Sequence, residues 1–229
     1  MKRFWDAVSF EASEGGFQIK LDHRSVRTPA KQLLVVPTEK IATQIAAEWD
    51  AQVEAVDPAS MPWTRTANAA IDKVATQRAD VMDHLNGYAG TDLLCYRAEG
   101  PDSLVSRQQE KWDPVLSWLK DHFGVSLKTT SGVMPVEQDP VDIRRLAGAM
   151  DKMSDFQLTG FHDLVGLSGS YAIGLAVVEK AFSTETLWSA ACLDEVWQTE
   201  QWGEDEEALA HTMSKKEAFL HATEVYWAA

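Results

Sequence analysis

The sequence predicts an α+β protein, with a small N-terminal β-rich α/β unit followed by a C-terminal α-helical bundle. Two observations favour this class. The first forty residues hold short apolar stretches, one with the two-residue alternation of a half-buried strand, separated by turn residues. From about residue 63 almost every segment has helical periodicity instead. We therefore expect an N-terminal domain over residues 1–60 and a helical domain over residues 61–229.

The N-terminal strands are predicted from alternation and turn residues. Residues 17–21 alternate apolar and polar side chains, and Glu14-Gly15-Gly16 before them is typical of a turn. Asp22-His23-Arg24 indicates a hairpin turn after this strand. Pro29 then limits the following segment to a sheet edge or an end, because proline cannot donate to a strand ladder.

The helices follow from spacing and capping residues. Thr38 can cap a helix over residues 39–53, and Ser183 can cap a helix that includes residues 187–202 and ends at Gly203. Further helical patterns cover residues 64–74, 77–88, 100–123 with a bend or break near Asp113-Pro114, 141–150, a segment capped by Ser154, 171–181 and 204–227.

Two segments do not fit this division clearly. Residues 92–96 are short and apolar, and they fit a strand or a helix equally. Residues 125–136 are the one later strand-like stretch, which could rejoin the N-terminal sheet.

Composition excludes several classes of function. The net charge of −14 argues against nucleic acid and anionic membranes, because both require clustered Lys and Arg. No window of about 20 apolar residues is present and the N-terminus has no signal-peptide core, so neither membrane insertion nor a targeting segment is expected. Cys95 and Cys192 are far apart in apolar surroundings, which indicates reduced, buried thiols in a reducing cytosol.

The candidate site is Leu193–Glu207, which combines two tryptophans with seven carboxylates. On a continuous helix, Asp194 falls within an apolar stripe and Glu195 falls between Trp188 and Trp202. A carboxylate on an apolar face is costly unless it has a partner. Two roles therefore remain open: an inward acid that pairs with an arginine or a helix N-terminus, or an acidic contact for a partner.

Catalytic patterns are weak in this sequence. Residues 166–170 (Gly-Leu-Ser-Gly-Ser) resemble a nucleophile elbow, but a serine replaces the last glycine and helical patterns flank the run. His162 and Asp163 are neighbours on a helix, where side chains point about 100° apart, so we do not expect them to pair. Asp194 and Glu195 diverge by the same angle and form a poor acid–base pair.

A metal or cofactor site has equally little support. A metal could bind the acids that open the last helix together with the histidine that follows, namely Asp205, Glu206, Glu207 and His211. Acids at a helix start are more often a complement to the helix dipole. The six histidines lack ligand spacing and no phosphate-binding loop is present, so neither metal nor cofactor is expected.

Several stretches, in order along nearly the whole chain, together resemble one family. They are Leu21-Asp22-His23-Arg24-Ser25-Val26-Arg27-Thr28-Pro29, Ala47-Glu48-Trp49-Asp50-Ala51-Gln52, Met61-Pro62-Trp63-Thr64-Arg65 with Asn68, Ile71 and Asp72, Gly90-Thr91-Asp92-Leu93-Leu94-Cys95-Tyr96-Arg97, Trp112-Asp113-Pro114, and Leu193-Asp194-Glu195 with Gln198 and Trp202-Gly203. The family is that of the assembly chaperones that hold the free alpha subunit of F-type ATP synthase.

The resemblance implies a non-catalytic chaperone that binds the alpha subunit before it pairs with beta and protects its exposed assembly surface. It also implies that one acid of the helical domain is important, which maps to Asp194 or Glu195. Gln198 and Trp202 complete the expected client-binding set. The chain resembles a bacterial, cytoplasmic member, whereas mitochondrial relatives work in the matrix. A monomer is expected because the sequence has no coiled-coil seam.

Structural or interdomain roles are expected for Trp49, Asp50, Trp197 and Gly203. The tryptophan of the Glu-Trp-Asp motif maps to Trp49, which shares a helix face with apolar residues. Two alternatives to the chaperone remain open: a helical scaffold for another protein partner, or an acid–base enzyme that uses Asp194 and Glu195.

Overall fold

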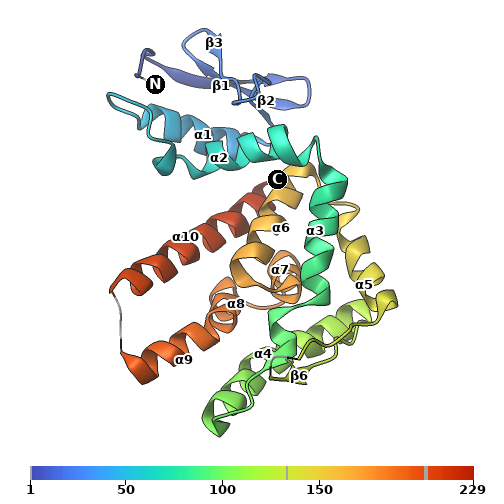
Figure 1. Cartoon of the computed structure of the whole chain (residues 1–229). Helices are drawn as coiled ribbons and strands as arrows, with labels where there is room; N and C mark the ends of the chain where they lie inside the picture. The colour runs from blue at the N-terminus through green and yellow to red at the C-terminus, as the bar shows by residue number, and fades with distance from the viewer. Residues whose placement is uncertain (1, 133, 204–205) are drawn as a thin grey trace. The chain divides into compact units, whose positions relative to one another are not determined.

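The computed structural model describes residues 2–132, 134–203 and 206–229, and its contacts form two compact units. Strands of an antiparallel sheet lie in the first unit and most helices in the second, which confirms the α+β class (Figure 1). The domain division predicted at residues 60 and 61 stays a prediction. Unit 1 consists of Met1–Arg78, Met153–Gly160 and Glu224–Ala229, and unit 2 of Ala79–Lys152 and Phe161–Thr223.

The sheet of unit 1 has four short strands: β1 (Val8–Ser13), β2 (Gly16–Leu21), β3 (Arg24–Ser25) and β4 (Val35–Val36). Strand β2 pairs antiparallel with the other three. The predicted alternation over residues 17–21 holds at Ile19 and Leu21, which are buried. Gly16 is required because its φ is 142° and a Cβ there would lie 2.1 Å from the Val36 carbonyl oxygen.

Helix α1 (Glu39–Asp50) packs on β1 and β2. The predicted cap is confirmed, because the Thr38 hydroxyl accepts from the Ile41 N–H at 3.3 Å. The core of unit 1 forms between this helix and the sheet, and it includes Trp5 and Trp49. The short helix η1 (Pro58–Ser60), helix α2 (Pro62–Ala69) and the π-helical turn η2 (Ala70–Val74) follow.

A carboxylate of α1 caps the start of α2. The Glu48 side chain accepts from the Trp63 N–H at 2.6 Å, from the Thr64 N–H at 2.8 Å and from the Thr64 hydroxyl at 2.7 Å. Partial burial raises the pKa of Glu48, an effect that these hydrogen bonds oppose. The Glu-Trp-Asp and Met-Pro-Trp-Thr-Arg motifs are therefore joined to each other within unit 1.

Asp72 makes a similar connection between η2 and the N-terminal strands. Its two carboxylate oxygens accept from the Thr28 hydroxyl at 2.6 Å and from the Ala30 N–H at 2.9 Å. Thr28 and Asp72 both belong to stretches that carry the family resemblance. Their direct contact gives those stretches a fold-supporting role in this unit.

The remaining elements are mostly helices. They are α3 (Arg78–Gly90), η3 (Leu93–Cys95), β5 (Tyr96–Arg97), α4 (Asp102–Phe123), β6 (Thr130–Ser131), α5 (Pro140–Ala147), η4 (Gly148–Met150), α6 (Asp155–Ser168), α7 (Tyr171–Val178), α8 (Thr184–Ala191), α9 (Leu193–Trp202) and α10 (Glu206–Ala228). Strand β6 pairs in parallel with β5, through Tyr96 opposite Thr130. The strand within residues 125–136 therefore belongs to a separate two-stranded sheet rather than to the N-terminal one.

Helix α4 is continuous across Asp113-Pro114, so of the bend or break expected there the break was wrong, while the bend stays a prediction. Proline removes one helical N–H, so a carbonyl one turn earlier loses its partner. Pro114 and Glu110 are both exposed, and the carbonyl can therefore be hydrated. Buried Trp112, Val115 and Leu119 keep the helix packed across this position.

Asp92 organises the interior of unit 2. It is fully buried, and its carboxylate accepts from the Leu94 N–H at 2.9 Å, from the Ser170 hydroxyl at 2.8 Å and from the Ala172 N–H at 2.9 Å. Burial raises the pKa of Asp92, whereas these donors favour its ionised form. The residue thus joins the start of η3 to the N-terminus of α7, where a negative charge is favourable.

Candidate functional site

The predicted site lies in unit 2, where a break at Cys192 divides the expected continuous helix over residues 187–202 into α8 and α9. This corrects the single helix assumed from the sequence. Cys192 has φ −94° and ψ 10°, yet its N–H and carbonyl keep helical bonds to Trp188 and Val196. No glycine or proline marks the position. Helix α4 packs against both α8 and α9, on either side of the break.

The ends of this pair of helices are as predicted. The Ser183 hydroxyl accepts from the Thr186 N–H at 3.1 Å and caps α8. Gly203 follows α9 with φ 94°, and its N–H donates to the Thr199 carbonyl at 2.9 Å. The left-handed backbone there favours glycine.

Asp194 is half-buried in the first turn of α9 and points to α4. Its Oδ1 accepts from the Gln108 side-chain amide at 2.8 Å. Gln108 is only 1% exposed, and its Oε1 accepts from the Ala98 N–H at 2.9 Å. An inward pairing was one of the two roles considered for this acid, with an arginine or a helix N-terminus as partner. The partner is instead a buried amide.

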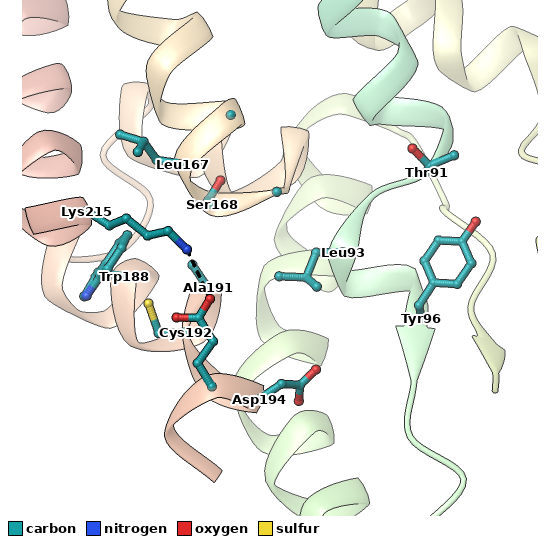
Figure 2. Close-up of a pocket in the computed structure, with 13 residues that line it drawn as sticks. Thr91, Leu93, Tyr96, Leu167, Ser168, Trp188, Ala191, Cys192, Asp194 and Lys215 are labelled. Carbon is teal, nitrogen blue, oxygen red and sulfur yellow. Dashed lines mark hydrogen bonds and ion pairs between the residues drawn. The ribbon is translucent and has the colours of Figure 1, made fainter. Parts of the chain in front are cut away.

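Glu195 is exposed and lies on another side of α9. Its Oε1 is 3.3 Å from the Nζ of Lys215 on α10. Figure 2 shows Asp194 directed away from Lys215, whose ammonium group makes the interaction drawn as a dashed line. The two neighbouring acids therefore bind different helices, and they do not form a carboxylate dyad.

A cavity of about 550 Å³ lies beside these acids (Figure 2). Its apolar wall includes Leu93, Leu167 and Trp188. Glu195 and Lys215, which form an ion pair, also line it. The Cys192 thiol also lines it. Burial, and secondarily the charge of Glu195, raises the pKa of this thiol to about 12. The thiol is neutral at physiological pH and is a poor nucleophile.

A second groove, of about 470 Å³, runs between α9 and α10. Val196 and Leu209 contribute apolar surface to it, and Glu195 and Glu200 contribute carboxylates. Glu195 lines both hollows. Gln198, another predicted client contact, also lines this groove, and Trp202 is 80% exposed at the end of α9.

The family model described as ATP12 chaperone protein matches residues 2–120, slightly more than half of the 229 residues. This chain belongs to the ATP12 chaperone family. The family resemblance inferred from the sequence is thereby confirmed, and the chain is an assembly chaperone of F1-ATPase rather than an enzyme.

Individual ATP12 relatives agree over most of the chain. Protein atp12, mitochondrial, from Schizosaccharomyces pombe is 25% identical over 219 residues, which cover 90% of this chain and 75% of that protein. The crystal structure of Atp12 from Paracoccus denitrificans is 44% identical, covers 98% of this chain and 97% of that one, and has a TM-score of 0.93. A mutant of the same Paracoccus protein, with lysine in place of an aspartate, also gives a TM-score of 0.93, with 98% and 96% coverage.

The residues expected to have structural roles in this ATP12 chaperone lie in both units. Trp49 is buried in unit 1, where its ring meets the Trp5 ring edge-on at 5.3 Å. The Asp50 carbonyl accepts from the Arg3 guanidinium at 2.7 Å, and its carboxylate lies 3.5 Å from the same group. Trp197 is half-buried on α9. An interdomain role for any of them stays a prediction.

The residues considered for catalysis make ordinary side-chain contacts in this ATP12 chaperone. The Ser168 hydroxyl is buried and donates to the Leu164 carbonyl at 2.7 Å, at the C-terminal end of α6. His162 Nδ1 and Asp163 Oδ1 are 3.2 Å apart, so the expectation that these neighbours would not pair was wrong. Their side chains turn toward each other, and both are partly exposed.

The metal site considered from the sequence has no support among the described residues. Asp205 lies outside the described residues, and among those described no three potential ligands come together. In the same described ranges, no helix is both long and apolar enough to cross a membrane.

Sequence reasoning missed Gln108 and Lys215, the partners of the two acids. Glutamine is usually a surface residue, so the type of Gln108 does not predict burial. Only its position on the face of α4 that also carries Trp112 indicates that it is buried. No sequence pattern identifies Lys215 as the partner of Glu195, because the pairing of α10 with α9 is a tertiary contact.

Proposed function

We propose that this ATP12-family chaperone binds the free alpha subunit of F-type ATP synthase and covers its assembly surface until the beta subunit replaces it. The observation that carries the proposal is the exposed acid Glu195 beside an apolar groove, on a chain of this family. A chaperone that holds a client needs accessible apolar surface with a charged rim, so that it binds without self-associating.

The surface of α9 and α10 has this composition. Val196, Trp202 and Leu209 are large apolar side chains with exposed fractions of 45%, 80% and 48%. Glu195 and Glu200 lie among them. The net charge of −14 favours a basic partner surface and speeds its association. We infer a monomeric chaperone that works in the bacterial cytoplasm and releases its client by competition with beta.

Within this surface we assign different roles to the two adjacent acids. Glu195 is the client contact, because it is exposed and its partner Lys215 has a long, flexible side chain. Asp194 is the positioning residue that joins α9 to α4 through Gln108. Gln198 and Trp202 follow Glu195 by three and seven residues, on the same face of α9, and complete the client contact.

Charge reversal tests the proposal. Asp194→Lys with Glu195→Lys is expected to abolish capture of purified alpha subunit by the immobilised chaperone, because a client cation would then meet an ammonium group at position 195 and the contact that joins α9 to Gln108 would be lost. Circular dichroism should show that the fold is kept. The matched control reverses two exposed acids of α3, with Asp80→Lys and Asp83→Lys, which change the net charge equally.

Single substitutions separate the two acids and cover the case in which the double variant is unstable. Glu195→Lys alone should lose most of the capture. The side chain is exposed, so its replacement should leave the core intact. Asp194→Asn should retain most of it. Full capture by a folded double variant would show that the client binds elsewhere.

A further inference from the structure

The α9–α10 groove has a shape and composition that select one kind of occupant. Its volume is about 470 Å³. The apolar surface comes from Val196 on one helix and from Ala208 and Leu209 on the other. Two neighbouring helices with exposed apolar residues between them form the kind of surface that accepts a third amphipathic helix.

Exposed apolar side chains extend this surface along both helices. Trp202 follows Gln198 by four residues and Met213 follows Leu209 by four, so each lies on the same helix face as a residue of the groove. Trp202 is 80% exposed and Met213 is 58% exposed. The apolar surface is therefore longer than the groove itself.

The charges of the groove determine the polarity of the occupant. Among its described lining residues, Glu195 and Glu200 carry formal charges at neutral pH, and both charges are negative. Glu200 is already engaged by Arg107, whose Nη1 lies 2.9 Å and 2.8 Å from its two oxygens. Glu195 is held more weakly, with one oxygen 3.3 Å from Lys215 and about half of its side chain exposed.

We propose that this groove binds an amphipathic helix of the client that carries a lysine or arginine beside its apolar stripe, and that this cation replaces Lys215 at Glu195. The inference rests on the proposed function and specifies the client segment that occupies the site. An exposed ion pair such as Lys215–Glu195 contributes little stability, so its exchange for a client cation costs little. Lys215 is then a competitor that keeps Glu195 neutralised while the chaperone is empty.

If Lys215 competes with the client cation, its removal should tighten client binding, whereas removal of a merely structural lysine should not. Lys215→Met removes the competing cation, and we expect it to tighten binding of the alpha subunit about two- to five-fold. Lys216→Met is the matched control, because it removes the same charge from the next residue, which pairs with Glu185 at 2.8 Å. The control should change the affinity less than Lys215→Met does.

The apolar part of the proposal has its own matched pair. Leu209→Ser should weaken binding of the alpha subunit about ten-fold or more, because Leu209 lies in the groove. Val141→Ser should not, since Val141 is similarly exposed at 51% but lies on α5. Both changes affect exposed side chains and should leave the fold intact.

The measurement is fluorescence anisotropy with labelled overlapping synthetic peptides of the alpha subunit, followed by titration of the whole purified subunit. The peptide bound most tightly should be amphipathic and basic, and it should respond to Leu209→Ser and to Lys215→Met as the whole subunit does. If the unsubstituted chaperone binds the whole subunit and neither substitution changes that affinity, the groove proposal is wrong and the proposed function stands. If it does not bind the subunit at all, both are wrong.

One further outcome concerns a second copy of this chain as the occupant. If Leu209→Ser converts a dimer into a monomer in size-exclusion chromatography and leaves alpha-subunit binding unchanged, the groove is a self-association surface, which overturns the proposal.

Discussion

Replacement of Asp92 by alanine should destabilise unit 2 by about 3 kcal/mol. The change leaves three donors without an acceptor in a fully buried place, namely the Leu94 N–H, the Ser170 hydroxyl and the Ala172 N–H. Each buried donor left unpaired costs about 1–3 kcal/mol. The variant also no longer buries a carboxylate, which offsets several kcal/mol of that loss. The net effect places Asp92→Ala at the upper end of the range of about 0.5–3 kcal/mol that is usual for single substitutions.

Urea denaturation followed by tryptophan fluorescence and circular dichroism measures this loss. With a slope of about 2–3 kcal/mol per molar urea, the transition that reports unit 2 should move down by about 1–1.5 M. Asp92→Asn should show a smaller loss, because one acceptor oxygen remains. Asp83→Ala, an exposed acid of α3, should change stability by less than about 0.5 kcal/mol. A loss below about 1 kcal/mol for Asp92→Ala would refute the role given to this carboxylate.

Four further outcomes are expected. Glu48→Gln should destabilise unit 1 by about 1–2 kcal/mol, because an amide N–H would face the N–H groups at the start of α2; an unchanged urea midpoint would contradict this. Burial raises the pKa of both Cys95 and Cys192 from 9.0 to about 12, so neither thiol should react with a disulfide reagent at pH 8 until the protein unfolds, and rapid labelling of the native protein would contradict it. The unfolded chain loses these protons first as pH rises, so stability should be unaffected by them below pH 9 and should fall between pH 9 and about 12. Gln108→Leu should lower stability by about 2–3 kcal/mol, because the Ala98 N–H and Asp194 lose their partner, while capture of the alpha subunit should stay within two-fold; a lost capture in the folded variant would make Asp194 part of the contact.

Local signals in the sequence were sufficient for the fold class and for most helix ends. Thr38 and Ser183 cap helices as predicted, and the Ser154 and Gln157 pair forms a capping box with bonds of 3.0 Å and 3.1 Å. Gly124 ends α4 with φ 67°, in the left-handed region. These features depend on residues close together in the chain, which a sequence displays directly.

The sequence was a poor guide wherever distant packing decides. The break at Cys192 and the continuity of α4 across Pro114 both run against local propensity. The location of β6 beside β5 depends on a pairing between segments more than thirty residues apart.

The contacts of single side chains at the site were equally hard to predict from the sequence. Angular placement on one helix separated the directions of Asp194 and Glu195, and the structure also separates them. The partners Gln108 and Lys215 are 86 and 20 residues away from their acids, and no local pattern identifies them. The assignment of these acids to client binding stays a prediction.

The most direct test of the central claim is a binding titration between the purified chaperone and the purified, free alpha subunit, monitored by calorimetry. We expect a stoichiometric complex with the alpha subunit, no binding to isolated beta subunit, and loss of the complex when beta is added in excess. Failure to bind the free alpha subunit, with both proteins folded, would contradict the account.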